Sequence, residues 1–243
     1  MTILVRLDKP AYISYRSIRL VAGAVRVLCG GRVQQKHYAA CRANEEIETV
    51  MTRIIVEAEP EGEGLTAVHS VFRAIHSLCP AIAKAIEAAQ HSLYRDGTLP
   101  RRLRELIRLR IGFHNQCRTC MAVRYAPDSV SESLVCSLER PADSPELTEA
   151  EQAALAFADL FATNHLAIDD AVYQRLRRHF AEGQIVELGF ICAIFLGTGR
   201  LAATWQVTEV LPESFRAAEG VVAPWGHDTV LSPQPERRPA SAE

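Results

Sequence analysis

The sequence lacks the features that define several large classes of protein. It has no apolar run approaching the ~20 residues of a membrane-spanning helix, so no membrane contact is expected. Its net charge is −2 and its pI about 6.5, which gives no whole-protein signature of nucleic-acid binding. Internal repeats, a low-complexity core and convincing runs of alternating strands are also missing. A chain of 243 residues with these properties is expected to fold around one well-buried core or two small ones.

Cysteine is present, but not in the pattern of a secreted disulfide scaffold. The seven cysteines are an odd number and are spread along a mid-sized chain, which indicates a reducing compartment and predicts a cytoplasmic protein. Cys79, Cys136 and Cys192 lie among apolar neighbours and are predicted to be small buried residues.

The composition divides the chain into three parts. Up to Asn44 the chain has eight Lys or Arg and a single acid, Asp8, and residues 1–50 are expected to be a poorly ordered or non-native extension, with Met51 as the natural start. An organelle transit peptide is the alternative for such an Arg-rich leader. Residues 51–215 are expected to form the folded domain, and the polar, Pro-rich residues 216–243 are expected to form a disordered tail.

The folded part has the pattern of successive helices. Apolar residues recur every three or four positions, and Thr148 and Glu151 form a capping box. The expected helices span residues 67–78, 80–94, 100–113, a short helix opened by Asn115, 127–139, 148–163, 169–180 and 184–209. This pattern predicts an all-α fold.

Two glycines in the last of these helices need a separate explanation. Gly197 and Gly199 formally match the GxGxxA pattern, but no strand precedes them, so a dinucleotide site is not expected. They are predicted to permit close helix packing. Residues 190–196 are apolar on nearly all sides, which predicts burial in the core or at a subunit interface.

The CxxC motif at residues 117–120 is the most informative feature of the chain. Two thiols three positions apart can close a disulfide across one turn of backbone, which is the working part of a dithiol redox site. With Asn115 as the helix cap, Cys117 falls in the first turn, where the dipole favours a thiolate. Arg118 and Arg124 add positive potential. Two alternatives are buried inert cysteines and a zinc site, although no second CxxC and no H-x₃₋₅-H pair completes four zinc ligands.

Glu105 is a candidate proton carrier for this dithiol. It lies twelve positions before Cys117, which is ~18 Å away in an unbroken helix. A break at residues 114–116 would instead place Glu105 opposite Arg124 and Tyr125. A carboxylate there can accept or donate a proton. The alternative is a surface glutamate near a helix start.

Residues 101–123 resemble the helix–break–CxxC segment of the alkylhydroperoxidase D-like (AhpD-like), or carboxymuconolactone decarboxylase-like, family. The resemblance is carried by Arg101, Arg102, Leu103, Arg104, Glu105, Leu106, Arg108, Leu109, Arg110, Asn115, Gln116, Cys117 and Cys120. It extends over roughly residues 52–213. It implies an all-α, AhpD-like helical bundle that assembles as trimers or hexamers and needs no cofactor or metal.

The resemblance also implies a set of site residues. In the redox branch of the family, a Glu and a His four residues after the second cysteine relay a proton to the thiols. Glu105, Cys117 and Cys120 match this pattern, whereas the His position holds Arg124, which cannot shuttle protons near neutral pH. Arg124 could pair with Glu105 or stabilise a thiolate, and His114 could substitute as the proton carrier.

The function implied is a thiol-dependent peroxidase that reduces hydroperoxides through a CxxC disulfide, recharged by a dithiol or disulfide-carrier partner protein. By analogy with the family, Cys120 attacks the peroxide and Cys117 resolves the intermediate. Two alternatives remain: a non-redox decarboxylase or hydrolase of the same fold acting on a small lactone or acid, and a non-catalytic redox-sensing helical oligomer. The presence of the CxxC motif argues against the non-redox decarboxylase or hydrolase, because such relatives need not keep the motif.

Overall fold

The computed structural model describes residues 28–29, 32–33, 52–56, 59–216 and 220–233. In the first of two compact units, Met1–Glu46, the described residues form two short antiparallel strands, β1 (Leu28–Cys29) and β2 (Arg32–Val33). The rest of the predicted N-terminal extension, and the proposed start at Met51, lie outside the described residues.

The second unit, Ile47–Glu243, is helical. Its described helices, with short 3₁₀ turns labelled η, are α1 (Leu65–His76), α2 (Pro80–Arg95), α3 (Arg101–His114), α4 (Arg118–Ala122), α5 (Glu132–Cys136), η1 (Ser137–Glu139), η2 (Pro141–Asp143), α6 (Glu149–Thr163), η3 (His165–Ala167), α7 (Asp170–Arg177), α8 (Glu182–Trp205) and α9 (Glu213–Arg216). The all-α prediction is confirmed for this unit. The predicted helix at 127–139 begins only at Glu132, because the Ser131 hydroxyl caps it by accepting from the Leu134 N–H.

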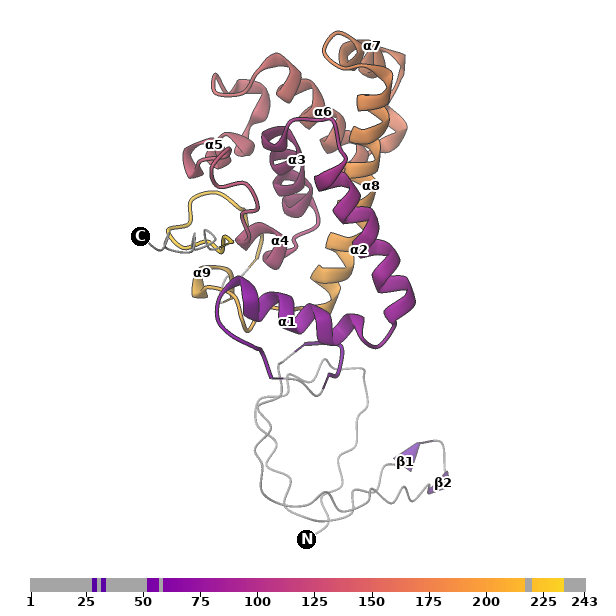
Figure 1. Cartoon of the computed structure of the whole chain (residues 1–243), viewed down its shortest axis with the longest axis vertical. Coiled ribbons are helices and arrows are strands. Elements are labelled where there is room, and N and C mark those ends of the chain that lie inside the picture. Colours follow the sequence, from indigo (N-terminus) through magenta and orange to yellow (C-terminus); the bar gives the residue numbers. More distant parts are fainter. Residues whose placement is uncertain (1–27, 30–31, 34–51, 57–58, 217–219, 234–243) are drawn as a thin grey trace, which may run out of the picture. The chain divides into compact units, whose positions relative to one another are not determined.

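Helix α3 lies at the centre of the unit, packed against α6 and α8 (Figure 1). Most of its residues are buried: Leu106, Ile107 and Leu109 are fully buried, and the polar Glu105 and Arg108 are buried with them. Helix α6 begins at the predicted capping box, in which Thr148 and Glu151 each accept from the other's backbone N–H. The central helix is the one that leads directly into the CxxC motif.

Helix α8 corrects one expectation from the sequence. Its 24 residues are long and apolar enough to cross a membrane by length and composition alone, whereas the sequence had indicated no such run. A core helix of a soluble protein meets the same criteria, and α8 packs on α3, α6 and α4. One side of it is buried through Leu188 and Ile191, while Phe190 is 57% exposed.

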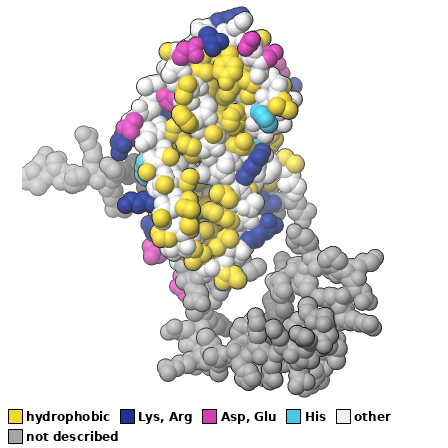
Figure 2. All heavy atoms as spheres, turned by 90° about the vertical axis from the view of Figure 1, so that its right-hand side faces the viewer, with side chains coloured by type: hydrophobic (Ala, Val, Ile, Leu, Met, Phe, Trp, Pro, Cys, Tyr) yellow, Lys and Arg dark blue, Asp and Glu magenta, His cyan; other side chains and the backbone are white. Residues whose placement is uncertain are grey.

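Helix α2 leaves its apolar side chains largely uncovered. None of its residues is buried, and it packs chiefly against α8. Ile82 on α2 is 66% exposed, and Ile86 on α2 and Val186 on α8 are exposed as well. Figure 2 shows apolar side chains gathered along this side of the molecule. The unit therefore presents one extended apolar face, formed by α2 and α8.

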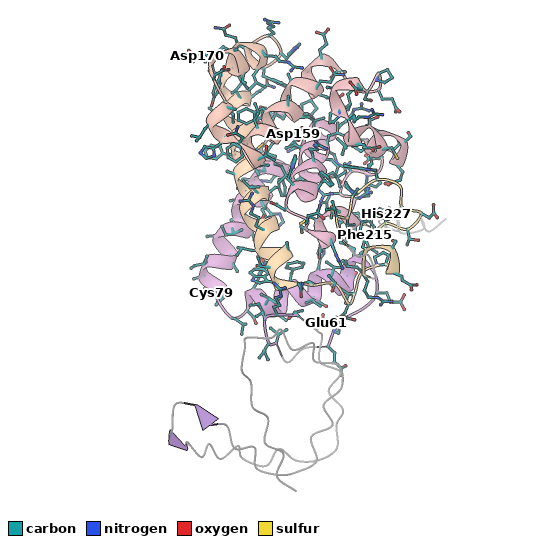
Figure 3. The ribbon with its side chains drawn as sticks, turned by 180° about the vertical axis from the view of Figure 1, so that it is seen from behind. Glu61, Cys79, Asp159, Asp170, Phe215 and His227 are labelled. Atoms are coloured by element: carbon teal, nitrogen blue, oxygen red, sulfur yellow. A yellow bond between two sulfur atoms is a disulfide. The ribbon has the colours of Figure 1, made fainter. Side chains whose placement is uncertain are left out.

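Part of the predicted C-terminal tail packs onto the domain. Within residues 220–233, Val222 is buried, and Leu231 forms a parallel bridge with Val123 at the end of α4. The Phe215 and His227 rings lie side by side with centroids 4.1 Å apart (Figure 3). Residues 217–219 and 234–243 lie outside the described residues.

The central position of α3 predicts a clear contrast between two leucines. Leu106→Ala empties a fully buried site and is expected to lower the free energy of unfolding by about 2–5 kcal/mol. Leu166→Ala makes the same chemical change at a side chain that is 86% exposed and should cost less than about 0.5 kcal/mol. Urea denaturation at one protein concentration measures both, and equal losses would contradict this assignment of the core.

Candidate active site

The chain reverses direction between α3 and α4 within three residues. Asn115 ends α3, and Gln116 then adopts a left-handed conformation with φ 50°. The Cys117 N–H donates to the Gly112 carbonyl at 3.1 Å, and the Gln116 N–H donates to Phe113 at 2.9 Å. These two bonds form a Schellman motif, which satisfies the last carbonyls of a helix as the chain leaves it. The predicted break at residues 114–116 is confirmed.

This motif corrects the predicted helix cap. Asn115 is the C-cap of α3 rather than the N-cap of α4, because the Schellman turn uses residues 115–117. Cys117 is itself the N-cap, and its sulfur accepts from the Cys120 N–H at 3.2 Å. Helix α4 has only five residues, so the dipole argument made from the sequence carries little weight.

Cys117 and Cys120 form a disulfide, with their Cα atoms 5.2 Å apart. Cys117 is completely buried, whereas Cys120 is half-buried. A Cβ placed on Gly199 of α8 would lie 3.6 Å from the Cys120 sulfur and would overlap the Asn115 amide. The glycine at 199 is therefore what lets α8 lie close to the dithiol, as the sequence predicted, while Gly197 meets nothing within 4 Å.

Glu105 lies where the predicted reversal places it. Its Oε1 accepts from the Tyr125 N–H at 2.8 Å, but its charged partner is Arg108, one turn along α3, at 2.7 and 2.8 Å. Burial alone would raise the pKa of Glu105, but the Arg108 charge and the hydrogen bonds from Arg108 and Tyr125 overcome it, and the pKa is lowered. A carboxylate held in its charged form by three hydrogen bonds is a weak proton acceptor.

Arg124, at the family's His position, does not pair with Glu105 as considered from the sequence. It is buried and forms a two-point ion pair with Glu132, at 2.7 and 2.9 Å. It also donates to the Met121 carbonyl at 2.6 Å and to the Pro224 carbonyl at 2.7 Å. Arg124 thus joins the end of α4 to α5 and to the C-terminal segment.

His114 belongs to a second cluster. Its Nε2 lies 2.7 Å from Asp159 Oδ1 on α6, and Arg110 Nε lies 2.6 Å from the same oxygen. Burial raises the pKa of Asp159, but hydrogen bonds from His114 and Arg110 outweigh this and lower it. Figure 3 shows Asp159 within the helical unit. With its ring nitrogen engaged by Asp159, His114 gains no support as a substitute proton carrier.

The free cysteines described in the helical unit are of two kinds. Cys192 is buried as predicted, and burial raises the pKa of its thiol to about 12. Cys79 and Cys136 are exposed, so the prediction that they are buried is wrong: Cys79 precedes α2, none of whose residues is buried, and Cys136 ends the short α5. Among the described residues, no group of three or more His, Cys, Asp or Glu could hold a metal ion.

A cavity of about 450 Å³ opens beside the redox motif. Its lining includes Arg118 and Thr119, the two residues between the cysteines, together with Ala202 of α8. Gln116 and Gln206 also line it, and they are the described non-glycine residues with positive φ. Backbone strain of this kind gathers at functional sites.

The close approach of α8 to Cys120 can be tested by one substitution in α8, with a control on the same helix. Gly199→Ala is expected to cost about 1–3 kcal/mol of stability and to slow alkylation of reduced Cys120, because the added methyl group lies over the sulfur. Gly197→Ala should leave alkylation unchanged and stabilise the helix by up to about 1 kcal/mol. Peptide-resolved alkylation rates and urea denaturation check both variants. Unchanged alkylation in Gly199→Ala would show that the approach is not as close as described.

Comparisons with known proteins agree with this geometry. Residues 80–160 match the model of the carboxymuconolactone decarboxylase family. An Agrobacterium tumefaciens structure, described as a protein of unknown function and a candidate antioxidant defence protein AhpD, is 24% identical with a TM-score of 0.50, covering 54% of this chain and 92% of its own. No curated protein matches the chain.

Two further solved structures are similar. An uncharacterized peroxidase-related protein from Ralstonia eutropha JMP134, with an alkylhydroperoxidase AhpD core, is 21% identical with a TM-score of 0.48, covering 59% of this chain and 77% of its own. A peroxidase-related protein from Silicibacter sp. TM1040 is 19% identical with a TM-score of 0.46, covering 56% and 73%. The family match therefore covers residues 80–160, and the likeness to the Agrobacterium protein shows that this chain has an AhpD-like helical fold.

Proposed function

We propose that this protein is a thiol-dependent peroxidase that reduces hydroperoxides through a Cys117–Cys120 dithiol/disulfide cycle. The observation that carries the proposal is the bonded pair itself, placed at a helix break with one sulfur buried and the other half-exposed. The family match over residues 80–160, and the likeness to the Agrobacterium protein described as a candidate antioxidant defence protein, support the same class of chemistry. A non-redox enzyme of this fold does not require the cysteine pair.

The exposure of the two sulfurs supports Cys120 as the attacking residue. Its thiolate would attack the terminal oxygen of the hydroperoxide, forming an S–O bond and breaking the O–O bond. The departing alkoxide takes a proton and leaves as an alcohol. The Cys117 thiolate then attacks the sulfenic sulfur, and hydroxide leaves and is protonated to water as the disulfide closes. An external dithiol restores both thiols and is itself oxidised to a disulfide.

In this cycle, solvent water donates and accepts the protons. Arg124 is engaged by Glu132 and by the Met121 carbonyl, and the pKa of Glu105 is lowered by its partners. The half-exposed position of Cys120 lets water reach the reacting sulfur. A Glu–His relay of the family type is therefore not part of the proposal.

The reductant and the assembly are also proposals. The reductant would be a dithiol or disulfide-carrier protein in the cytoplasm, since the scattered cysteines favour a reducing compartment. We place a homo-oligomer contact, in a trimer or hexamer, on the apolar face of α2 and α8. Support comes from α2, which has no buried residue in the isolated chain although Ile82 and Ile86 point apolar side chains outward.

The oligomer contact predicts a change in mass. Ile82→Glu introduces a charge on the exposed apolar surface of α2, in its first turn, and should shift the protein from its oligomer towards the monomer, as sedimentation velocity would record. Leu166→Glu places the same charge on an exposed residue of η3, outside α2 and α8, and should leave the mass unchanged. A monomeric wild-type protein, or equal masses for wild type and Ile82→Glu, would overturn the contact.

The catalytic cycle predicts strict dependence on both cysteines. Cys117→Ser and Cys120→Ser should each abolish turnover of hydroperoxide with a dithiol reductant, because neither variant can close the disulfide. Cys79→Ser and Cys136→Ser change exposed thiols outside the motif and should retain wild-type rates.

The same assay separates the other functions. A single oxidation of the wild-type protein without turnover would indicate a redox sensor. Turnover that survives in either motif variant would refute the dithiol mechanism. No reaction of the thiols with peroxide would favour the non-redox enzyme.

A further inference from the structure

Helix α4 cannot satisfy its own last carbonyl groups. The chain leaves the helix at Val123 in an extended conformation, so no following turn supplies N–H donors. All four terminal carbonyls are nevertheless bonded. Arg108 donates to Cys120 at 2.7 Å and to Val123 at 2.6 Å. Arg124 donates to Met121, and the Leu231 N–H donates to Ala122 at 2.8 Å.

Arg108 differs from Arg124 in the carbonyl groups that it bonds at the end of α4. Its guanidinium is buried and bonds the carbonyl of Cys120 itself, the half-exposed cysteine. Its two other contacts run to Glu105, whose carboxylate holds the guanidinium plane in place. The Tyr125 ring covers the guanidinium at 4.8 Å from its centroid. The Arg108 charge is therefore fixed close to the dithiol and shielded from water.

We propose that Arg108 is the positioning residue of the dithiol, and that its charge, balanced by Glu105, sets how readily Cys120 gives up its proton. This inference rests on the dithiol cycle proposed above and deepens it. A fixed cation favours a nearby thiolate, and a fixed anion disfavours it. The two charges therefore have opposite effects on Cys120: Arg108 favours the thiolate, and Glu105 disfavours it.

Other charged or titratable groups face this region from the surrounding elements. They are Arg118 in α4, Arg124 and Tyr125 after it, Glu132 in α5, Tyr94 in α2, Arg104 in α3 and Arg200 in α8. Arg124 is balanced by Glu132, and Arg200 is held by the Asn115 side chain at 3.3 Å. Tyr94 and Tyr125 are neutral near neutral pH, because burial raises the pKa of both. The Glu105–Arg108 pair is the buried ion pair that bonds the backbone of Cys120 directly.

The test exploits the opposite signs of the two charges. Glu105→Gln keeps the size of the side chain but leaves Arg108 uncompensated, so the midpoint pH for alkylation of reduced Cys120 should fall. Arg108→Met removes the cation, so the midpoint should rise. Each shift should change the thiolate fraction at a fixed pH by about threefold or more, a difference of about half a pKa unit. Peptide mass spectrometry of the full-length reduced protein follows Cys120 separately from the other thiols.

The matched control lies on the same helix. Arg110 makes a two-point ion pair with Asp159 and bonds the Leu138 carbonyl, but its bonds run to α6 and η1 rather than to α4. Arg110→Met should therefore leave the Cys120 midpoint unchanged. Midpoints that move in the same direction in Glu105→Gln and Arg108→Met would mean that the pair is only structural, and would overturn the proposal. If Arg108→Met does not fold, Glu105→Gln decides alone, and an unchanged or raised midpoint overturns it.

The readout separates this inference from the peroxidase assignment, because alkylation needs no peroxide. Opposite shifts in a protein that does not turn over hydroperoxide would support the positioning role and sink the peroxidase. Turnover of hydroperoxide, combined with midpoints that move in the same direction in both variants, would support the peroxidase and overturn the positioning role. Arg108→Lys adds a further check: it keeps the charge, but its three N–H donors cannot replace the four hydrogen bonds of Arg108, so its midpoint should lie nearer the wild type than that of Arg108→Met.

Discussion

The structure depends on one sharp reversal of the chain after α3. The Schellman turn at residues 115–117 satisfies the end of the central helix and, in the same three residues, places Cys117 as the N-cap of the next helix. Without this turn, an unbroken helix would carry the cysteines away from Glu105. With it, α4 lies against α3, and the polar side chains of α3 reach the backbone of α4. The redox motif and its supports are therefore one local arrangement.

The second consequence of the reversal is electrostatic. A five-residue helix that ends in the interior exposes carbonyl groups that water cannot reach, and buried polar groups need partners. Two buried arginines and the Leu231 N–H supply these partners, and each arginine is balanced by a carboxylate, Glu105 or Glu132. The arrangement keeps the interior near the dithiol neutral overall while placing fixed charges beside it. The contacts of Arg124 fit this reading, since they join the end of α4 to α5 and to the C-terminal segment.

The sequence predicted the fold well, because helical periodicity and caps are local signals. The capping box at Thr148, the cap at Asp169 and the break before Cys117 are all where the pattern placed them. The approach of Glu105 to Tyr125 also followed from spacing, once a reversal was assumed.

The sequence did not predict the partners of the charged residues, because tertiary packing decides which groups a long side chain can reach. Arg108 had no distinguishing signal beyond its place three residues after Glu105, and Arg124 was considered a partner of Glu105 rather than of Glu132. The contacts of residues 220–233 were missed for a similar reason. They depend on backbone groups such as the Leu231 N–H and the Pro224 carbonyl, which carry no residue-specific pattern.

The central claim is that Cys117 and Cys120 are a redox pair whose chemistry is separate from that of the other thiols. One equivalent of hydroperoxide added to the fully reduced protein, followed by alkylation and peptide mass spectrometry, tests it most directly. We expect a Cys117–Cys120 disulfide, with Cys79, Cys136 and Cys192 recovered as free thiols. Oxidation spread over the exposed cysteines, or a reduced 117–120 pair after the peroxide is consumed, would contradict the account.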